Sequence, residues 1–185
     1  MLKNLTRAGA LALAAILAAL AAGVTQAQAQ AQAQQPLKVG FVYVTPVGDA
    51  GWTYQHDLGR LAMQRALGKR VQTSVVDSVA EGPDAERVLR DLAAQGHGLI
   101  FATSFGYLEA ALRVAGEFPQ VRFEHAGGYR TTANLNTYNA RYYEARYLAG
   151  LLAGKSSRSG IAGYVAGFPV PEVVQGINAF ALGMQ

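Results

Sequence analysis

The sequence predicts an α/β protein built on a mostly parallel, doubly wound sheet. From Pro36 onward, short runs rich in β-branched and aromatic residues alternate with segments whose apolar residues recur at helical spacing. The turns between them are rich in glycine, proline and polar residues. Strands that are joined through helices run parallel. The alternation therefore predicts a parallel sheet, whose connecting helices cover both of its faces.

Six strands are expected. They cover residues 39–44, 71–76, 97–103, 121–125, 134–138 and 160–166. The clearest helix is the one that Pro83 opens and Gly96 ends, with acidic residues in its first turn. Its apolar positions are Ala85, Val88, Leu89, Leu92 and Ala93. Four more helices are expected from the apolar sets Tyr54/Leu58/Leu61/Ala62, Leu108/Ala111/Leu112/Ala115, Ala145/Leu148/Ala149/Leu152 and the inward-facing Val173/Ile177/Phe180.

Residues 1–33 are predicted to be a secretory signal peptide. Lys3 and Arg7 precede an unbroken run of small and apolar residues, and the Gln/Ala repeat that follows offers several A-x-A cleavage sites. A retained membrane anchor is the alternative interpretation. The chain has no cysteine, so the stability of the exported domain has to come from its core and not from disulfides.

The composition limits the function classes. The formal net charge is +4, and two of the positive charges lie in the predicted signal peptide. The remaining charge is too small and too scattered to favour nucleic acid as a partner. Walker A, G-x-G-x-x-G and Cys/His metal-ligand spacings are all missing, so no cofactor and no metal are expected.

The carboxyl ends of parallel strands meet at one edge of a sheet, where α/β proteins bind ligands. The loops that should reach this edge carry Asp49, Trp52, Ser104, Phe105, Glu124, His125, Phe168 and Glu172. Trp52 is the only tryptophan, and it stands where a loop joins a helix. It is therefore a candidate stacking surface for a planar ligand.

Five ordered segments resemble the basic membrane protein family, the purine-nucleoside-receptor-like solute-binding proteins of ABC importers. They are GWTYQHDLGR, LIFATSFGY, FPQVRFEHAGGY, NARYYEARYLAGLLAG and GYVAGFPVPEVVQGINAFALG. The resemblance covers Leu37 to the end and implies the type I periplasmic-binding-protein fold, with two α/β lobes around a hinge. Because helical periodicity continues to the last residue, we expect a first lobe over 34–138 and the beginning of a second, incomplete lobe over 139–185.

The resemblance also implies the ligand and its contacts. Known members bind purine nucleosides or, in the branch that this sequence looks like, a free base such as adenine. By position, Trp52 matches an aromatic residue that stacks on the purine, Asp49 matches an acid of the same loop, and Thr53 stands where many members have Asn. Ser104, Phe105 and Gly106 match a loop that lines the cleft, and Phe168 lies in the first loop of the second lobe. The family's lipoprotein cysteine is absent, which implies a soluble periplasmic protein, and we expect it to be a monomer.

The expected function is therefore a periplasmic binding protein, not an enzyme, which captures a purine and docks on an ABC permease. Two alternatives remain: a ligand-sensing subunit of a receptor, and an exported nucleoside hydrolase. A hydrolase could combine Ser104, His125 and Asp49, but no G-x-S-x-G motif surrounds the serine.

Most of these residues also have a purely structural interpretation. Trp52 could be a wedge, Asp49 a turn cap, and Ser104 a helix N-cap, while Phe105 and Phe168 could belong to the core. His56 and Asp57 diverge by about 100° on a helix, which predicts a solvated face with Asp57 near Arg60. The remaining features are interpreted as helix packing for Tyr142, Tyr143 and Tyr147 and as surface for Arg113, Arg122, Arg130, Arg141 and Arg146.

Overall fold

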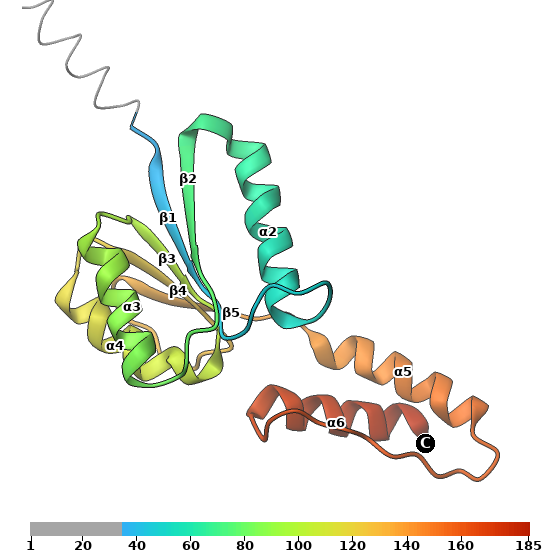
Figure 1. Cartoon of the computed structure of the whole chain (residues 1–185). Coiled ribbons are helices and arrows are strands. Elements are labelled where there is room, and N and C mark those ends of the chain that lie inside the picture. The colour runs from blue at the N-terminus through green and yellow to red at the C-terminus, as the bar shows by residue number, and fades with distance from the viewer. Residues whose placement is uncertain (1–34) are drawn as a thin grey trace, which may run out of the picture.

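The computed structural model describes residues 35–185, so the predicted signal peptide lies outside the described part of the chain. Five parallel strands form one sheet in the order β2-β1-β3-β4-β5. They are β1 (Leu37–Val42), β2 (Val71–Val76), β3 (Leu99–Ala102), β4 (Arg122–Ala126) and β5 (Leu135–Tyr138). The first five predicted strands are thereby confirmed. The chain moves from central β1 outward to β2 and then across to the other side, which is the doubly wound pattern (Figure 1).

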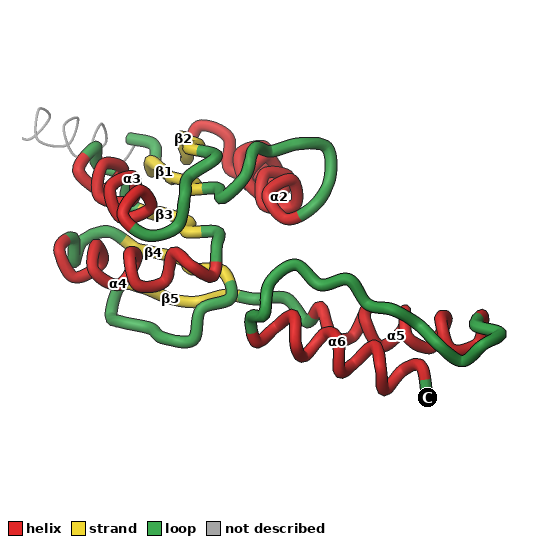
Figure 2. The backbone as a smooth tube through the Cα atoms, turned by 60° about the horizontal axis from the view of Figure 1, so that its bottom comes forward, coloured by secondary structure: helices red, strands yellow, loops and turns green. Residues whose placement is uncertain are grey.

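Helices cover both faces of this sheet. Helix α2 (Trp52–Leu67) lies on one face, whereas α3 (Pro83–Ala94) and α4 (Leu108–Glu117) lie on the other (Figures 1 and 2). Short 3₁₀ turns, Gly68–Arg70 and Phe105–Tyr107, precede β2 and α4. Side chains of β1 alternate between the two layers, because successive residues of a strand point to opposite faces.

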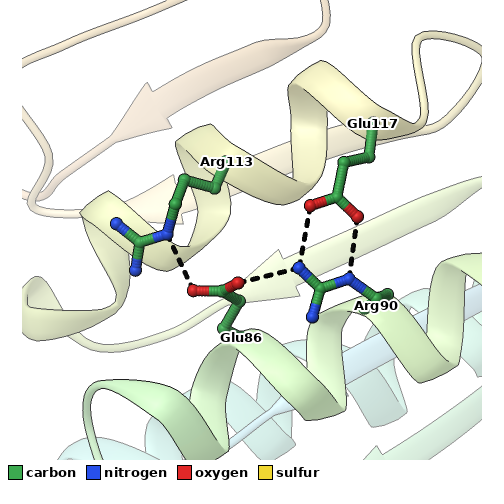
Figure 3. A network of polar contacts seen from close by, with 4 residues as sticks. All are labelled: Glu86, Arg90, Arg113 and Glu117. Atoms are coloured by element: carbon green, nitrogen blue, oxygen red, sulfur yellow. Dashed lines mark hydrogen bonds and ion pairs between the residues drawn. The ribbon is translucent and has the colours of Figure 1, made fainter.

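The larger core lies beneath α3 and α4. All five apolar residues predicted for α3 are buried, and they pack with Ile100, Phe123 and Leu135 of the sheet. On the outer surface, Arg90 joins Glu86 of its own helix to Glu117 of α4, and Arg113 of α4 returns to Glu86 (Figure 3). This chain of four charges ties the two helices together.

Helix α2 packs through a different face from the predicted one. Its buried side chains are Thr53 and Asp57, while Leu58 is exposed. The buried Tyr43 explains this, because its hydroxyl donates a hydrogen bond of 3.2 Å to Asp57. The prediction of a solvated face for Asp57 was therefore wrong, although its pairing with Arg60, at 2.7 Å, is confirmed.

Helices α5 (Tyr142–Ser156) and α6 (Pro171–Met184) lie side by side, away from the sheet (Figures 1 and 2). They run in the same direction, since Gly150 meets Phe180 and Gly154 meets Met184. A Cβ atom on Gly150 would stand only 2.1 Å from the Phe180 carbonyl oxygen, so this contact is made by bare backbone. The pair depends on glycine for its close approach.

The expected sixth strand, 160–166, is not formed. The segment 157–170 returns from the end of α5 to the start of α6 without pairing in a sheet. A strand needs a hydrogen-bonded neighbour, and no described strand lies beside this one. Most of the apolar set predicted for α5 is exposed as well, including Leu148 and Leu152. Both differences have one cause, which is that nothing among the described residues covers these surfaces.

Candidate functional site

Trp52 stands at the carboxyl end of the sheet as the first residue of α2. The preceding Gly51 has a φ of 91°, a conformation that favours glycine and turns the chain sharply into the helix. The indole Nε1–H of Trp52 donates a hydrogen bond to the carbonyl of Thr103, just beyond β3. The polar edge of the indole is thus fixed to the sheet, and the ring is held in place.

Two aromatic side chains flank the indole. The ring of His56 lies 4.8 Å from it and that of Tyr142 lies 6.3 Å away, centroid to centroid. His56 Nδ1–H also donates to the carbonyl of Trp52, at 2.9 Å. Burial lowers the pKa of His56, and this hydrogen bond opposes the shift only in part. The histidine therefore packs beside Trp52 as a neutral ring near pH 7.

A cavity of about 250 Å³ opens beside the indole. Its lining residues come from α2, α5, the returning segment and the start of α6. They are Trp52, Tyr142, Arg146, Tyr164, Val165, Ala166, Gly167, Glu172, Val173 and Gly176. The cavity combines aromatic side chains with one cation and one anion, which suits a small planar ligand that carries hydrogen-bonding groups.

A polar cluster directly follows Thr103 at the end of β3. Ser104 stands at the N-cap position of the Phe105–Tyr107 turn, as predicted, but its hydroxyl donates a hydrogen bond of 2.7 Å to Glu81 and none to the helix backbone. A Cβ atom on Gly106 would stand only 2.1 Å from the Glu81 carboxyl carbon. The glycine therefore makes room for this carboxylate. Phe105 faces Tyr129, with 6.1 Å between ring centroids.

His125 is fully buried at the end of β4. Neither of its ring nitrogens has a hydrogen-bond partner of good geometry among residues 35–185. Burial lowers its pKa to about 4, and the nearby backbone of Ser104 and Phe105 offsets only part of that shift. A neutral, enclosed imidazole cannot reach a substrate in this structure, so the Ser104/His125/Asp49 arrangement is not assembled.

The predicted site residues fall into three groups. Trp52 lines the cavity, and the buried Thr53 lies directly beneath the loop, where its hydroxyl meets that of Thr45 at 2.7 Å. Ser104, Phe105 and Gly106 form the neighbouring cluster at the end of β3. Asp49 and Phe168 are exposed and do not line the cavity.

Sequence reasoning missed Tyr142, Arg146 and Tyr164 as cavity residues. Arg146 is indeed on the surface, as expected, and yet it lines the cavity. The only signal available was spacing, because Tyr142 and Arg146 are four residues apart and share one face of a helix. Nothing in the spacing tells which helix face meets Trp52.

Residues 35–185 contain no cluster of three or more His, Cys, Asp or Glu that could hold a metal ion. Within the same residues, none of the helices has the length and apolar character needed to span a membrane.

Comparison with known proteins identifies the family. Residues 37–185 match the family described as ABC transporter substrate-binding protein, PnrA-like. The chain belongs to this family of substrate-binding proteins. It is 56% identical over 151 residues to a purine-binding protein of Brucella abortus, covering 82% of this chain and 43% of that protein.

A second relative, from Haloferax volcanii, is named as a glucose-binding protein of an ABC transporter. It is 42% identical over 149 residues, covering 80% of this chain and 38% of that protein. The chain thus spans about two fifths of the length of these two relatives.

Solved structures agree on the fold. A solute-binding protein of an ABC transporter from Conexibacter woesei has a TM-score of 0.63 and 26% identity, covering 80% of this chain and 50% of that one. One from Aeropyrum pernix has a TM-score of 0.67 and 23% identity, covering 80% and 43%. The expected periplasmic-binding-protein fold is confirmed, and the described residues correspond to about half of each of these proteins.

Proposed function

We propose that this protein captures a purine in the periplasm, with Trp52 as the stacking surface, and delivers it to the permease of an ABC importer. The observation that carries the proposal is the position of Trp52. Its polar edge is bonded to Thr103, while the residue also lines a cavity with Tyr142 and Tyr164. An aromatic side chain contributes roughly 1–3 kcal/mol when a base stacks on it.

The relatives support a purine more than a sugar. The Brucella protein, named for purine binding, is 56% identical to this chain, against 42% for the protein named for glucose. Rings also stack on sugars, so Trp52 alone does not separate the two ligand classes. The charged side chains of the cavity can separate the two classes. A ligand whose groups pair with them is favoured, because a binding site rejects analogues that leave its polar groups unpaired.

The proposal includes the organisation of the chain. Residues 1–33 direct export, residues 34–138 form the first lobe, and residues 139–185 begin a second lobe. The exported protein is a monomer. The ligand lies between the lobes, and closure about the hinge is the signal that the permease reads. Binding of this kind needs no covalent step, so no residue is assigned a catalytic role.

Calorimetric titration of the full-length protein tests the proposal. Adenine, hypoxanthine, adenosine, guanosine, inosine and glucose are compared at one pH and one salt concentration. We expect at least one purine to bind with a dissociation constant well below that of glucose. Tight binding of glucose with no binding of any purine would contradict the proposal. Release of a free base from adenosine or inosine during the titration would instead favour the hydrolase.

A further inference from the structure

Glu172 reaches from α6 back to the edge of the sheet. Its Oε2 accepts a hydrogen bond of 2.9 Å from the amide of Asn139, which follows β5. The same oxygen lies 3.4 Å from the place where a Cβ atom on Gly127 would stand, and Gly127 has a φ of 71°. The carboxylate therefore rests on bare backbone just after β4. This side chain thus links α6 to the carboxyl end of the sheet.

The same carboxylate lines the cavity together with Trp52. Oε2 is engaged by Asn139, whereas Oε1 has no hydrogen-bond or ion-pair partner among residues 35–185, although Arg146 lines the same cavity. Its negative charge acts on its surroundings, because burial and Glu172 together raise the pKa of Tyr142. One acceptor oxygen beside the stacking ring is thus available.

We propose that Glu172 determines ligand specificity by accepting, through Oε1, a hydrogen bond from an N–H group of the purine base that stacks on Trp52. This inference rests on the proposed function and deepens it. An ionised carboxylate only accepts hydrogen bonds, so it favours a base with an amino group over one with a carbonyl at the same place. Adenine and hypoxanthine differ in this way, which makes adenine the preferred base. Asn139 is a positioning residue, because it fixes the other oxygen.

Glu172→Gln is the informative substitution because it keeps the shape of the side chain. The Asn139 amide donates, so the new side chain must turn its own oxygen toward Asn139 and its NH₂ group toward the cavity. A donor then stands where an acceptor was. We expect adenine to bind roughly tenfold to a hundredfold more weakly, the range for losing a hydrogen bond to a charged group. Hypoxanthine should lose little or bind more tightly, since its carbonyl can accept from the amide.

The matched control is Glu144→Gln, which makes the same charge change in the first turn of α5, where Glu144 pairs with Arg141 outside the cavity. It should leave both affinities unchanged. Circular dichroism and thermal melting verify that each variant is folded. Asn139→Ala offers a second variant, which frees the carboxylate without removing it and should cost adenine less than Glu172→Gln does.

Three outcomes would overturn the inference while leaving the proposed function intact. They are an unchanged adenine affinity in Glu172→Gln, equal losses for adenine and hypoxanthine, and a loss confined to nucleosides, which would assign the contact to ribose. Failure of the parent protein to bind any purine would overturn the proposed function itself, so the two failures are distinguishable.

Discussion

The sheet region and the pair of helices that follows it are stabilised in different ways. Among residues 35–185, all of the buried apolar side chains lie between Val39 and Leu135. From residue 139 to the end, the only buried residues are Gly150, Gly176 and Gly183. The first region buries side chains between layers, whereas the second brings two backbones together and leaves its side chains exposed or only half-buried.

This difference shows what the second region lacks. Its exposed apolar residues include Leu148, Leu152, Ile161, Val165, Phe168 and Leu182. Large apolar side chains left exposed together in one part of a protein mark an interface. We propose that the remainder of a second lobe covers this surface in the full-length protein, where 160–166 would find a neighbouring strand.

The largest contrast is expected from one substitution made in each region. Leu89 in α3 is 0% exposed and Leu152 in α5 is 70% exposed. Leu89→Ala should lower the free energy of unfolding by about 2–5 kcal/mol, because it removes apolar contacts and leaves a cavity. Leu152→Ala should change it by no more than about 0.5 kcal/mol in this chain. Urea unfolding followed by circular dichroism measures both, and equal costs would remove the distinction between the regions.

Acid should weaken the sheet region through His125. Its folded-state pKa of about 4 lies below the ordinary 6.5, so the unfolded chain binds a proton in the pH range where the native chain does not. Stability should therefore fall as the pH drops from about 6.5 to about 4, by roughly 3 kcal/mol in all. Unfolding at several pH values should show this slope in the parent. If the stability of His125→Leu depended on pH in the same way, the pH dependence would come from other groups.

Glycine substitutions probe the backbone contact in the second region. In Gly150→Ala the new methyl group meets the Phe180 carbonyl at 2.1 Å, so α5 and α6 have to separate, at a cost of about 1–3 kcal/mol. Gly59→Ala in α2 meets nothing within 4 Å and should stabilise its helix by about 0.5–1 kcal/mol. Hydrogen exchange should show lost protection in α5 and α6 for the first variant alone. Unchanged protection there would contradict the close packing.

The smallest effect is expected at the surface of the sheet region. Arg90→Ala breaks the charge network between α3 and α4 and should lower the melting temperature by about one to a few degrees. Arg130→Ala, which breaks an isolated exposed pair with Glu109, should do less.

The same network should respond to acid. Hydrogen bonds from arginine hold the pKa of Glu86 and of Glu117 below the ordinary 4.5, so the network's contribution is present above that pH and lost as the pH falls further. A melting temperature for Arg90→Ala equal to that of the parent at pH 7 would show that the network contributes nothing.

The sequence predicts most of the sheet region because local pattern and tertiary packing agree there. The apolar spacing in α3 matches the buried face residue for residue, and five strands lie within two residues of their expected ends. In α2 the two disagree. Leu58 suggested the buried face, but the hydroxyl of Tyr43 selects Asp57, and a hydrogen bond from a neighbouring strand leaves no trace in the spacing of one helix.

The candidate site could be predicted only in part, for a related reason. Trp52 was identifiable because it is unique and follows a strand. Tyr142, Arg146 and Tyr164 join it through the packing of α5, the returning segment and α6. That packing depends on glycine contacts over about thirty residues of separation, as between Gly150 and Phe180, and not on any local pattern.

Trp52 is the proposed ligand contact, and calorimetric titration of its variants with adenine shows whether the ligand touches it. Trp52→Ala in the full-length protein should weaken binding roughly tenfold to a hundredfold, which corresponds to about 1–3 kcal/mol. Trp52→Phe loses the hydrogen bond to Thr103 but keeps an aromatic face, so it should retain much of the affinity. A folded Trp52→Ala variant with a lower melting temperature and an unchanged dissociation constant would show that Trp52 is a structural wedge and does not contact the ligand.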